Sequence, residues 1–354
     1  MRRARGMKLA ALAIAGSLAL AACASDEPAG GSGGSGGSGG GEDGPKIGLA
    51  YDTGGRGDKS FNDSAYAGVE AAIETNGGTV QEISPNSDAS DRADLLTQLA
   101  DQGFNPVIAV GFAYGDVIGD VAQQYPDTSF AIVDSSGVDV ADNVTGLLFA
   151  ANEGSFLGGV AAATKSETGN VGFVGGVETP LIQAFEAGFV AGAQAVNPDI
   201  TVQVQYISPA GDFSGFNDPA RGQIVAQGMF DGGADIVYAA AGGSGIGVFQ
   251  AAAASGKRAI GVDSDQYETV GDPALQAVIM TSVLKRVDNA VEAYIGTFVD
   301  GSVEGGTDVV SDLSTEGVGL SYSGGFIDDI KSTIDEYTQK IVDGDITVPE
   351  TPSN

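Results

Sequence analysis

Short apolar runs alternate with amphipathic segments along most of this 354-residue chain. The first run, residues 47–51 (IGLAY), lies between a proline and a glycine pair, a pattern typical of a buried parallel strand. A helical pattern follows from Phe61 to Ile73, with Ser60 as its expected N-cap. Ligands of open α/β sheets bind beyond the carboxyl ends of the strands, so the turn between these two elements is a candidate ligand site.

The alternation continues to the end of the chain in two series. The first has strand-like runs at 79–83, 107–111, 130–134 and 144–149, and helical patterns at roughly 91–102, 114–125 and 152–164. The second has strand-like runs at 171–175, 202–207, 236–240, 258–263 and 277–281, and helices at about 181–193, 219–230, after 243, 283–300 and 326–342. This order predicts an α/β protein of two doubly wound, Rossmann-like lobes. Such lobes bind a ligand in the cleft between them and close about a hinge.

The first 22 residues have the pattern of an export signal. Four cations (Arg2, Arg3, Arg5 and Lys8) precede an apolar run that is too short for a comfortable membrane span. The run ends in Leu-Ala-Ala-Cys, which looks like a bacterial lipobox cleaved before Cys23. We therefore expect a signal peptide at 1–22 and a lipid anchor on Cys23, at the extracytoplasmic face of the cell membrane.

Residues 23–44 are rich in glycine and serine and contain no apolar stretch to bury. About twenty residues of such flexible chain would hold a domain on the order of 25 Å from its anchor. The roughly 310 residues that follow are long for one core and suit two lobes.

The charge and the missing residue types exclude several function classes. The formal net charge is −31, and loss of the signal peptide's four cations would leave about −35. Such a surface disfavours the binding of nucleic acid, anionic lipid and nucleotide phosphates. The simplest interpretation of the charge is that it keeps the protein soluble. The chain has no histidine and one cysteine, which excludes Ser-His-Asp, Cys-His and histidine-zinc sites. The glycine turn lacks dinucleotide-binding spacing, and Asp52 and Asp58 would repel a pyrophosphate.

Residues 46–64, which contain Asp-Lys-Ser-Phe-Asn, resemble the opening of the basic membrane protein family. Members of this family are lipoproteins that serve as nucleoside-binding subunits of ABC importers. The resemblance extends to about Pro349 through several separate motifs in the same order: residues 171–198, 216–222 (FNDPARG), 262–266 (VDSDQ), 281–291 and 343–349.

The resemblance implies the type I periplasmic-binding-protein fold, in which the chain crosses three times between the lobes. We accordingly expect lobe one at 45–150 plus 280–310 and lobe two at 151–279 plus 311–354. It also implies that a purine base stacks between Phe61 and Phe216, since stacking is worth roughly 1–3 kcal/mol per base.

The implied polar contacts divide between the base and the sugar. Asp52 would accept hydrogen bonds from the base, with Asn62 assisting it or holding the loop. Asp263 and Lys285 would hold the ribose hydroxyls. A backbone amide at Gly242 or Gly243 would approach the sugar, and Asp58 and Asp134 are two further implied contacts.

Several of these positions also have a purely structural interpretation, whereas Phe216, in a polar loop, is harder to explain as a core residue. Phe61 could face the core from its helix, and Asp134 could be a turn residue or a helix N-cap. Asp263 and Lys285 could form a salt bridge near the hinge, which is compatible with ligand binding. The two glycines could belong to an ordinary turn. Arg56-Gly57 departs from the aliphatic and acidic residues common in the family, so contacts from that loop tip stay open.

The expected function is capture of a nucleoside, with purines favoured, and its delivery to the permease and ATPase of an ABC importer. No enzyme activity, cofactor, metal or nucleic acid is expected, and a closing two-lobe receptor can act as a monomer. Three alternatives stay open. A sugar or an autoinducer could occupy the same fold, a nucleoside hydrolase would need clustered aspartates for calcium, and a protein-binding lipoprotein would need an exposed apolar patch.

Overall fold

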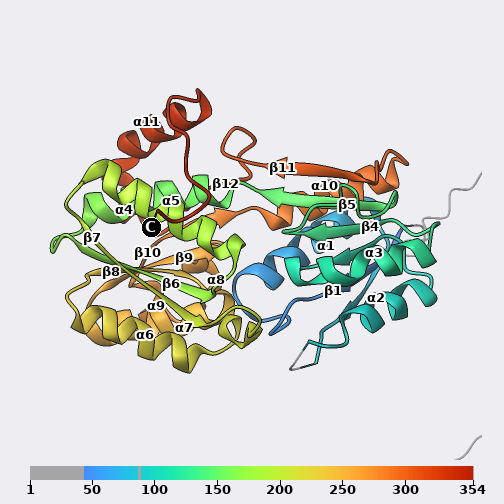
Figure 1. The fold of residues 1–354 in the computed structure, drawn as a ribbon, viewed down its shortest axis with the longest axis horizontal. Helices are drawn as coiled ribbons and strands as arrows, with labels where there is room; N and C mark the ends of the chain where they lie inside the picture. Colours follow the sequence, from blue (N-terminus) through green and yellow to red (C-terminus); the bar gives the residue numbers. More distant parts are fainter. Residues whose placement is uncertain (1–43, 87–88, 354) are drawn as a thin grey trace, which may run out of the picture. The chain divides into compact units, whose positions relative to one another are not determined.

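Two six-stranded sheets organise the chain, and each carries helices on both faces (Figure 1). The computed structural model describes residues 44–86 and 89–353, all within one compact unit. The expected signal peptide, the lipidated Cys23 and all but the last residue of the expected tether lie outside the described residues. The predicted α/β fold of two doubly wound lobes is confirmed.

The first lobe contains an all-parallel sheet with the strand order β11-β5-β4-β3-β1-β2. Alternate residues of its strands point to opposite faces, as the two-residue period of a strand requires. Leu49 and Ile108 pack against α1 and α10, whereas Ala50 and Val107 pack against α2 and α3. The elements are β1 (Lys46–Ala50), α1 (Phe61–Asn76), β2 (Thr79–Ile83), α2 (Arg92–Asp101), β3 (Val107–Ala109), α3 (Gly115–Gln124), β4 (Phe130–Val133), β5 (Val144–Phe149), α10 (Val287–Val299) and β11 (Thr307–Ser311), with the 3-10 turn η1 (Phe112–Tyr114).

The second lobe contains a sheet with the order β12-β10-β9-β8-β6-β7, parallel except for β12. Helices α4, α5 and α11 cover one face, and α6, α7 and α9 cover the other. The elements are α4 (Ala151–Lys165), β6 (Asn170–Val177), α5 (Pro180–Val196), β7 (Thr201–Ser208), α6 (Pro219–Asp231), β8 (Ile236–Ala240), α7 (Gly245–Ser255), β9 (Arg258–Asp263), α8 (Gln266–Thr269), α9 (Pro273–Gln276), β10 (Ile279–Lys285), β12 (Val318–Leu320) and α11 (Lys331–Val342), with the 3-10 turns η2 (Phe213–Phe216), η3 (Gly242–Ser244) and η4 (Asp328–Ile330).

The chain passes between the two lobes after β5, after β10 and after β11. The lobe boundary expected at residue 280 is wrong, because β10 runs to Lys285 and belongs to the second sheet. The helix expected from Val283 begins at Val287 instead. The cause is β12, a three-residue strand that pairs antiparallel with Val283–Lys285 and holds this segment extended. A strand so short leaves no recognisable pattern in the sequence.

Helices α4 and α5 contact each other through glycines. A Cβ added at Gly188 would lie 2.1 Å from the carbonyl oxygen of Asn152, and one at Gly159 would lie 2.1 Å from that of Phe189. Only glycine allows the two backbones to approach so closely. Because α4 directly follows the first crossing, this contact packs the chain against α5 as soon as it enters the second lobe.

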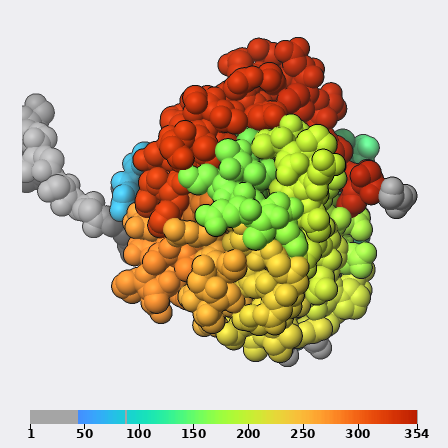
Figure 2. All heavy atoms as spheres, turned by 90° about the vertical axis from the view of Figure 1, so that its left-hand side faces the viewer, coloured from blue at the N-terminus to red at the C-terminus, as the bar shows by residue number. Residues whose placement is uncertain are grey.

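The last residues of the chain pack on the second lobe. Figure 2 shows the segment that includes α11, in red, beside the green surface of α4. The Asn152 side chain donates a hydrogen bond of 3.0 Å to the carbonyl of Val348, and Val348 joins the core of this lobe. The C-terminal segment is therefore part of the lobe that carries α4 and α5.

Candidate functional site

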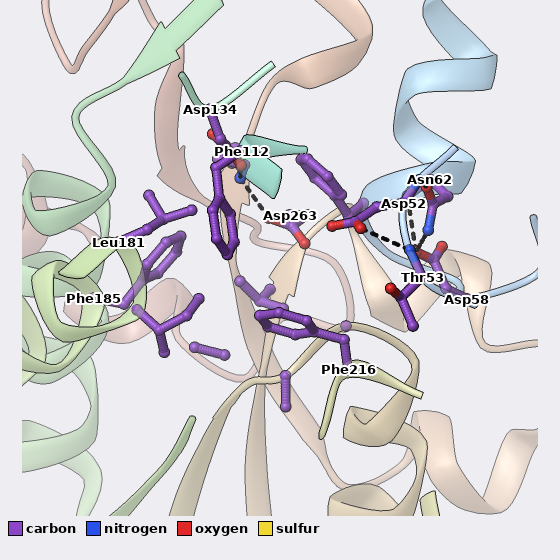
Figure 3. A pocket seen from close by; sticks show the side chains of 17 residues that line it. Asp52, Thr53, Asp58, Asn62, Phe112, Asp134, Leu181, Phe185, Phe216 and Asp263 are labelled. Atoms are coloured by element: carbon purple, nitrogen blue, oxygen red, sulfur yellow. Dashed lines mark hydrogen bonds and ion pairs between the residues drawn. The ribbon is translucent and has the colours of Figure 1, made fainter. Parts of the chain in front are cut away.

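A cavity lies where the strand ends of the two sheets face each other (Figure 3). Both lobes contribute to its wall. Nine of the ten residues expected to contact a ligand line it, namely Asp52, Asp58, Phe61, Asn62, Asp134, Phe216, Gly242, Asp263 and Lys285. Gly243 does not line it and lies close behind Phe216.

One end of the cavity is built by the loop between β1 and α1. The Asn62 side-chain oxygen accepts the backbone N–H of Asp52 at 2.9 Å. The Asp58 carboxylate accepts the backbone and side-chain N–H groups of Asn62 at 2.8 and 3.1 Å. Asn62 therefore holds the loop in place, and Figure 3 shows the three side chains together at this end.

Asp58, rather than Ser60, supplies the capping oxygens at the start of α1. Its carboxylate also accepts the backbone N–H groups of Ser60 and Asp63 at 3.0 and 3.1 Å, while Ser60 makes no capping bond with its side chain. The Ser60 hydroxyl instead donates to Asp263 of the second lobe at 2.7 Å. Burial raises the pKa of Asp58 to about 6, although these backbone N–H groups oppose the shift.

Asp52 is buried beside a cation that the sequence did not reveal. Its Oδ1 accepts the backbone N–H of Thr53 at 2.7 Å and the guanidinium of Arg92 at 3.2 Å. Burial raises the pKa of Asp52, and the Thr53 N–H and Arg92 oppose that rise. Arg92 begins a helix whose start is rich in charged residues, so nothing in its pattern marked it as buried.

Lys285 lies between two carboxylates at another part of the cavity wall. Its ammonium is 2.6 Å from Asp134 and 3.6 Å from Asp263, and all three side chains are at most 7% exposed. Burial alone would lower the pKa of Lys285, but the two carboxylates outweigh it and the pKa is raised. The two carboxylates thus stabilise the charged form of the lysine.

The backbone at both aspartates is left-handed, with φ of 65° at Asp134 and 62° at Asp263. Each lies at the carboxyl end of a strand, β4 in the first lobe and β9 in the second. Left-handed backbone is unusual away from glycine, although aspartate tolerates it better than most residues. In both lobes this bend directs a carboxylate from a buried strand toward Lys285.

Aromatic and aliphatic side chains form the remaining walls. Phe61 comes from the first lobe and Phe216 from the second, and each also packs partly against the core of its own lobe. Sequence reasoning missed further wall residues, namely Thr53, Phe112, Leu181, Ile182, Phe185, Ala240, Ala241 and Val262. Figure 3 shows Leu181 and Phe185 across the cavity from Asp52 and Asn62. Their helical spacing in α5 looked like that of an ordinary core face.

The lobes also bond to each other directly beside the cavity. The carbonyl of Lys59 accepts hydrogen bonds from Gln266 at 3.0 Å and Thr269 at 3.1 Å, and the carbonyl of Ser60 accepts one from Ser264 at 2.9 Å. These bonds join the start of α1 to the segment after β9. The described arrangement is therefore a closed one, in which the lobes contact each other around the cavity.

Within the part of the chain that the structure describes, no helix combines the length and the continuous apolar surface of a membrane span. No group of three or more histidine, cysteine, aspartate or glutamate side chains there is arranged to hold a metal ion.

Residues 46–352 match the family model of PnrA-like ABC transporter substrate-binding proteins. The chain belongs to this family. The family consists of substrate-binding proteins rather than enzymes, and the predicted resemblance is confirmed.

Three relatives show how much of the chain is shared. A CD4+ T-cell-stimulating antigen of Listeria monocytogenes is 39% identical over 86% of this chain and 88% of its own length. The ABC transporter nucleoside-binding protein BmpA of Lactococcus lactis is 36% identical over 98% of this chain and 99% of its own length. Basic membrane protein A of Borreliella burgdorferi is 35% identical over 86% of this chain and 88% of its own length.

A solved structure supports the same fold. An ABC transporter solute-binding protein of Aeropyrum pernix is 29% identical and superimposes with a TM-score of 0.75, over 88% of this chain and 94% of that chain. The similarity therefore covers both lobes and the cavity between them.

Proposed function

We propose that the protein is a lipid-anchored extracytoplasmic receptor that binds nucleosides, with purines favoured, and delivers them to an ABC importer. The observation that carries this proposal is the composition of the cavity. It combines an aromatic ring from each lobe, an acceptor carboxylate at Asp52 and the group Asp134, Lys285 and Asp263 in one cavity. The name of the Lactococcus relative as a nucleoside-binding protein supports it.

Each part of a nucleoside has a counterpart in the cavity wall. Phe61 and Phe216 would contact the faces of the base, where stacking is worth roughly 1–3 kcal/mol. Asp52 would accept from the edge of the base. The carboxylate of Asp263 and the ammonium of Lys285 would accept from and donate to the ribose hydroxyls. Gly242, which lines the cavity next to the Phe216 ring, would let the sugar approach the backbone.

The charges of the cavity favour an uncharged ligand. Four carboxylates line it (Asp52, Asp58, Asp134 and Asp263), and the nearby cations Lys285 and Arg92 are already paired with three of them. A phosphate placed here would meet excess negative charge, so nucleotides should be rejected. We infer that no catalytic step occurs in the cavity and that the ligand leaves unchanged.

Closure of the lobes is the expected binding step. The ligand would complete the wall formed by both lobes, and the bonds from Lys59 and Ser60 to the segment after β9 would form as they close. The closed form is the one that a permease would recognise. We propose that Cys23 carries the lipid that keeps the receptor near that permease.

A thermal-shift screen tests the proposal. The purified protein is first unfolded and refolded to remove endogenous ligand, then tested with nucleosides, nucleotides, free bases, pentoses and hexoses. A ligand at a hundred times its dissociation constant stabilises the folded state by about 2.7 kcal/mol, so a shift is easily measured. The proposal expects a shift with purine nucleosides but not with bases or ribose. A shift with sugars alone would contradict it.

A further inference from the structure

Arg92, the first residue of α2, is the buried cation at the Asp52 end of the cavity. Its guanidinium donates to Asp52 at 3.2 Å and to the Thr53 hydroxyl at 3.4 Å. The side chains of Arg92 and Asp52 are each only 9% exposed. Two ions so little exposed are stable in a protein only when they are paired. Arg92 therefore stabilises the charged form of the carboxylate that would meet the base.

Arg92 also determines which oxygen of Asp52 is available. Both Arg92 and the Thr53 N–H bond to Oδ1. Oδ2 lies against Gly111, where an added Cβ would be only 2.6 Å from it. Gly111 has a φ of 110°, a conformation that favours glycine. Among the described residues no donor bonds to Oδ2, and Asp52 lines the cavity, so Oδ2 is the oxygen left to accept from a ligand.

The second lobe covers this ion pair. The ring of Phe213, in η2, lies 4.9 Å from the Arg92 guanidinium and 5.8 Å from the ring of Phe112. On the first lobe's own side, the ring of Tyr114 lies 5.6 Å from the same guanidinium. When the lobes close, Phe213 shields the pair from water, and an electrostatic interaction strengthens where water is excluded.

We propose that Arg92 is a positioning residue that determines ligand specificity, because it stabilises the charged form of Asp52 and leaves one oxygen to accept an N–H donor of the base. This inference deepens the proposed function and rests on it. The ligands selected are then nucleosides whose base carries an N–H group at this end of the cavity. Bases that present only acceptors there are rejected, since an acceptor facing an ionised carboxylate is repelled.

The pH dependence of binding separates this role from simple packing. The charged and titratable groups around Asp52 are Arg92 from α2, Asp58 from the loop before α1, Tyr114 from η1 and Asp134 from the end of β4. Among these groups, Arg92 is the cation. Without it, burial and the neighbouring carboxylates would raise the pKa of Asp52 further, and the acid would bind a proton as the pH falls.

The experiment compares two probes by calorimetry from pH 5.5 to 8. Inosine has an N–H donor on its base, and purine riboside has none while adding no bulk. The wild-type protein should prefer inosine by about ten-fold or more at every pH, the usual effect of a hydrogen bond to a charged group. Arg92→Met should lose most of this preference at pH 5.5 and regain part of it as the pH rises. Arg92→Lys should keep more of it at low pH.

Two controls accompany these variants. Arg258→Met removes a guanidinium that lies 4.4 Å from the Phe326 ring, outside the cavity, and should leave the preference unchanged. If Arg92→Met does not fold, Arg92→Met combined with Asp52→Ala leaves no buried charge unpaired and no side-chain acceptor facing the base. That double variant should show no preference and no pH dependence.

Three results would overturn the inference. A folded Arg92→Met variant could keep the wild-type preference for inosine over purine riboside at pH 5.5. It could instead lose affinity for both probes equally at every pH, which would indicate that Arg92 acts through packing alone. The double variant could retain the preference, which would show that Asp52 does not contact the base. Wild-type protein that binds neither probe nor any other nucleoside would instead overturn the proposed function, and this inference with it.

Discussion

The ammonium of Lys285, at the end of β10 in the second lobe, lies 2.6 Å from the carboxylate of Asp134, at the end of β4 in the first. The pair joins the two lobes within the cavity wall. Because Lys285 also lies 3.6 Å from Asp263, a ligand that bonds to any of the three changes a contact between the lobes. Ligand binding and closure are therefore linked at this group.

Loss of the ring at Phe216 should weaken nucleoside binding. We expect Phe216→Ala to reduce affinity ten-fold to a hundred-fold, on the order of 1–3 kcal/mol, because a stacked base loses one face. The melting temperature should change little, since Phe216 is only partly buried. Calorimetric titration with inosine measures the loss. Phe298→Ala, at a half-buried position of α10 outside the cavity, is the matched control. Equal affinity in both variants would remove Phe216 from the site.

Asp263 should distinguish ribonucleosides from nucleosides that lack sugar hydroxyls. Asp263→Asn should weaken the binding of a ribonucleoside about ten-fold or more, because a charged acceptor is lost. A 2′,3′-dideoxynucleoside makes no such bond and should lose much less. Binding constants for both ligands in both proteins check this. Equal losses would show that the carboxylate acts only through Lys285 and Ser60.

The contact between α4 and α5 should not tolerate a larger residue at Gly188. An added methyl group would lie 2.1 Å from the carbonyl of Asn152, so we expect Gly188→Ala to lower the free energy of unfolding by about 1–3 kcal/mol. Gly228→Ala, on α6, meets nothing within 4 Å and should be neutral or slightly stabilising. Urea denaturation of the two variants makes the comparison, and equal stabilities would contradict the close packing.

Asp58 should make stability depend on pH. Burial raises its pKa to about 6, whereas in the unfolded chain it is about 3.9. Between these values the folded protein keeps a proton that the unfolded chain has released, so the free energy of unfolding falls as the pH rises from about 4 to 6. Over this range the free energy of unfolding of the wild-type protein should fall by on the order of 1–2 kcal/mol relative to that of Asp58→Asn. The effect is smaller than the full shift in pKa would give, because the side chain is only partly buried.

Denaturation of both proteins at pH 4, 5, 6 and 7 tests this. Other titrating groups cancel in the difference between the two proteins. A difference that stays constant with pH would show that Asp58 ionises normally in the folded state.

Cys23 should determine where the protein is found in the cell. If Cys23 carries the lipid, Cys23→Ser should release the protein from the membrane fraction, because the chain would lose its anchor. Cell fractionation followed by immunoblotting measures this. Ser25→Ala, two residues away, serves as the control and should stay with membranes. Continued sedimentation of Cys23→Ser with membranes would contradict a lipid anchor at this position.

Much of the fold could be predicted because it depends on local patterns. The run Ile47–Tyr51 and the helical spacing after Phe61 are visible in the residues alone, and both elements form where expected. The boundary at residue 280 could not be predicted, since it depends on pairing between Val283 and Leu320. A partner 37 residues away leaves no trace in a short window of sequence.

By itself, the sequence determined the two series of strands and helices, the family and the five charged residues that line the cavity. Strand ends and glycine turns follow from local conformational preferences, which neighbouring residues set. Only the tertiary structure decided that Arg92 pairs with Asp52, that Ser60 bonds across the lobes and that Leu181 and Phe185 face the cavity. These contacts join residues far apart in the chain, and their energies come from burial and electrostatics, which exist only once the lobes have folded and closed.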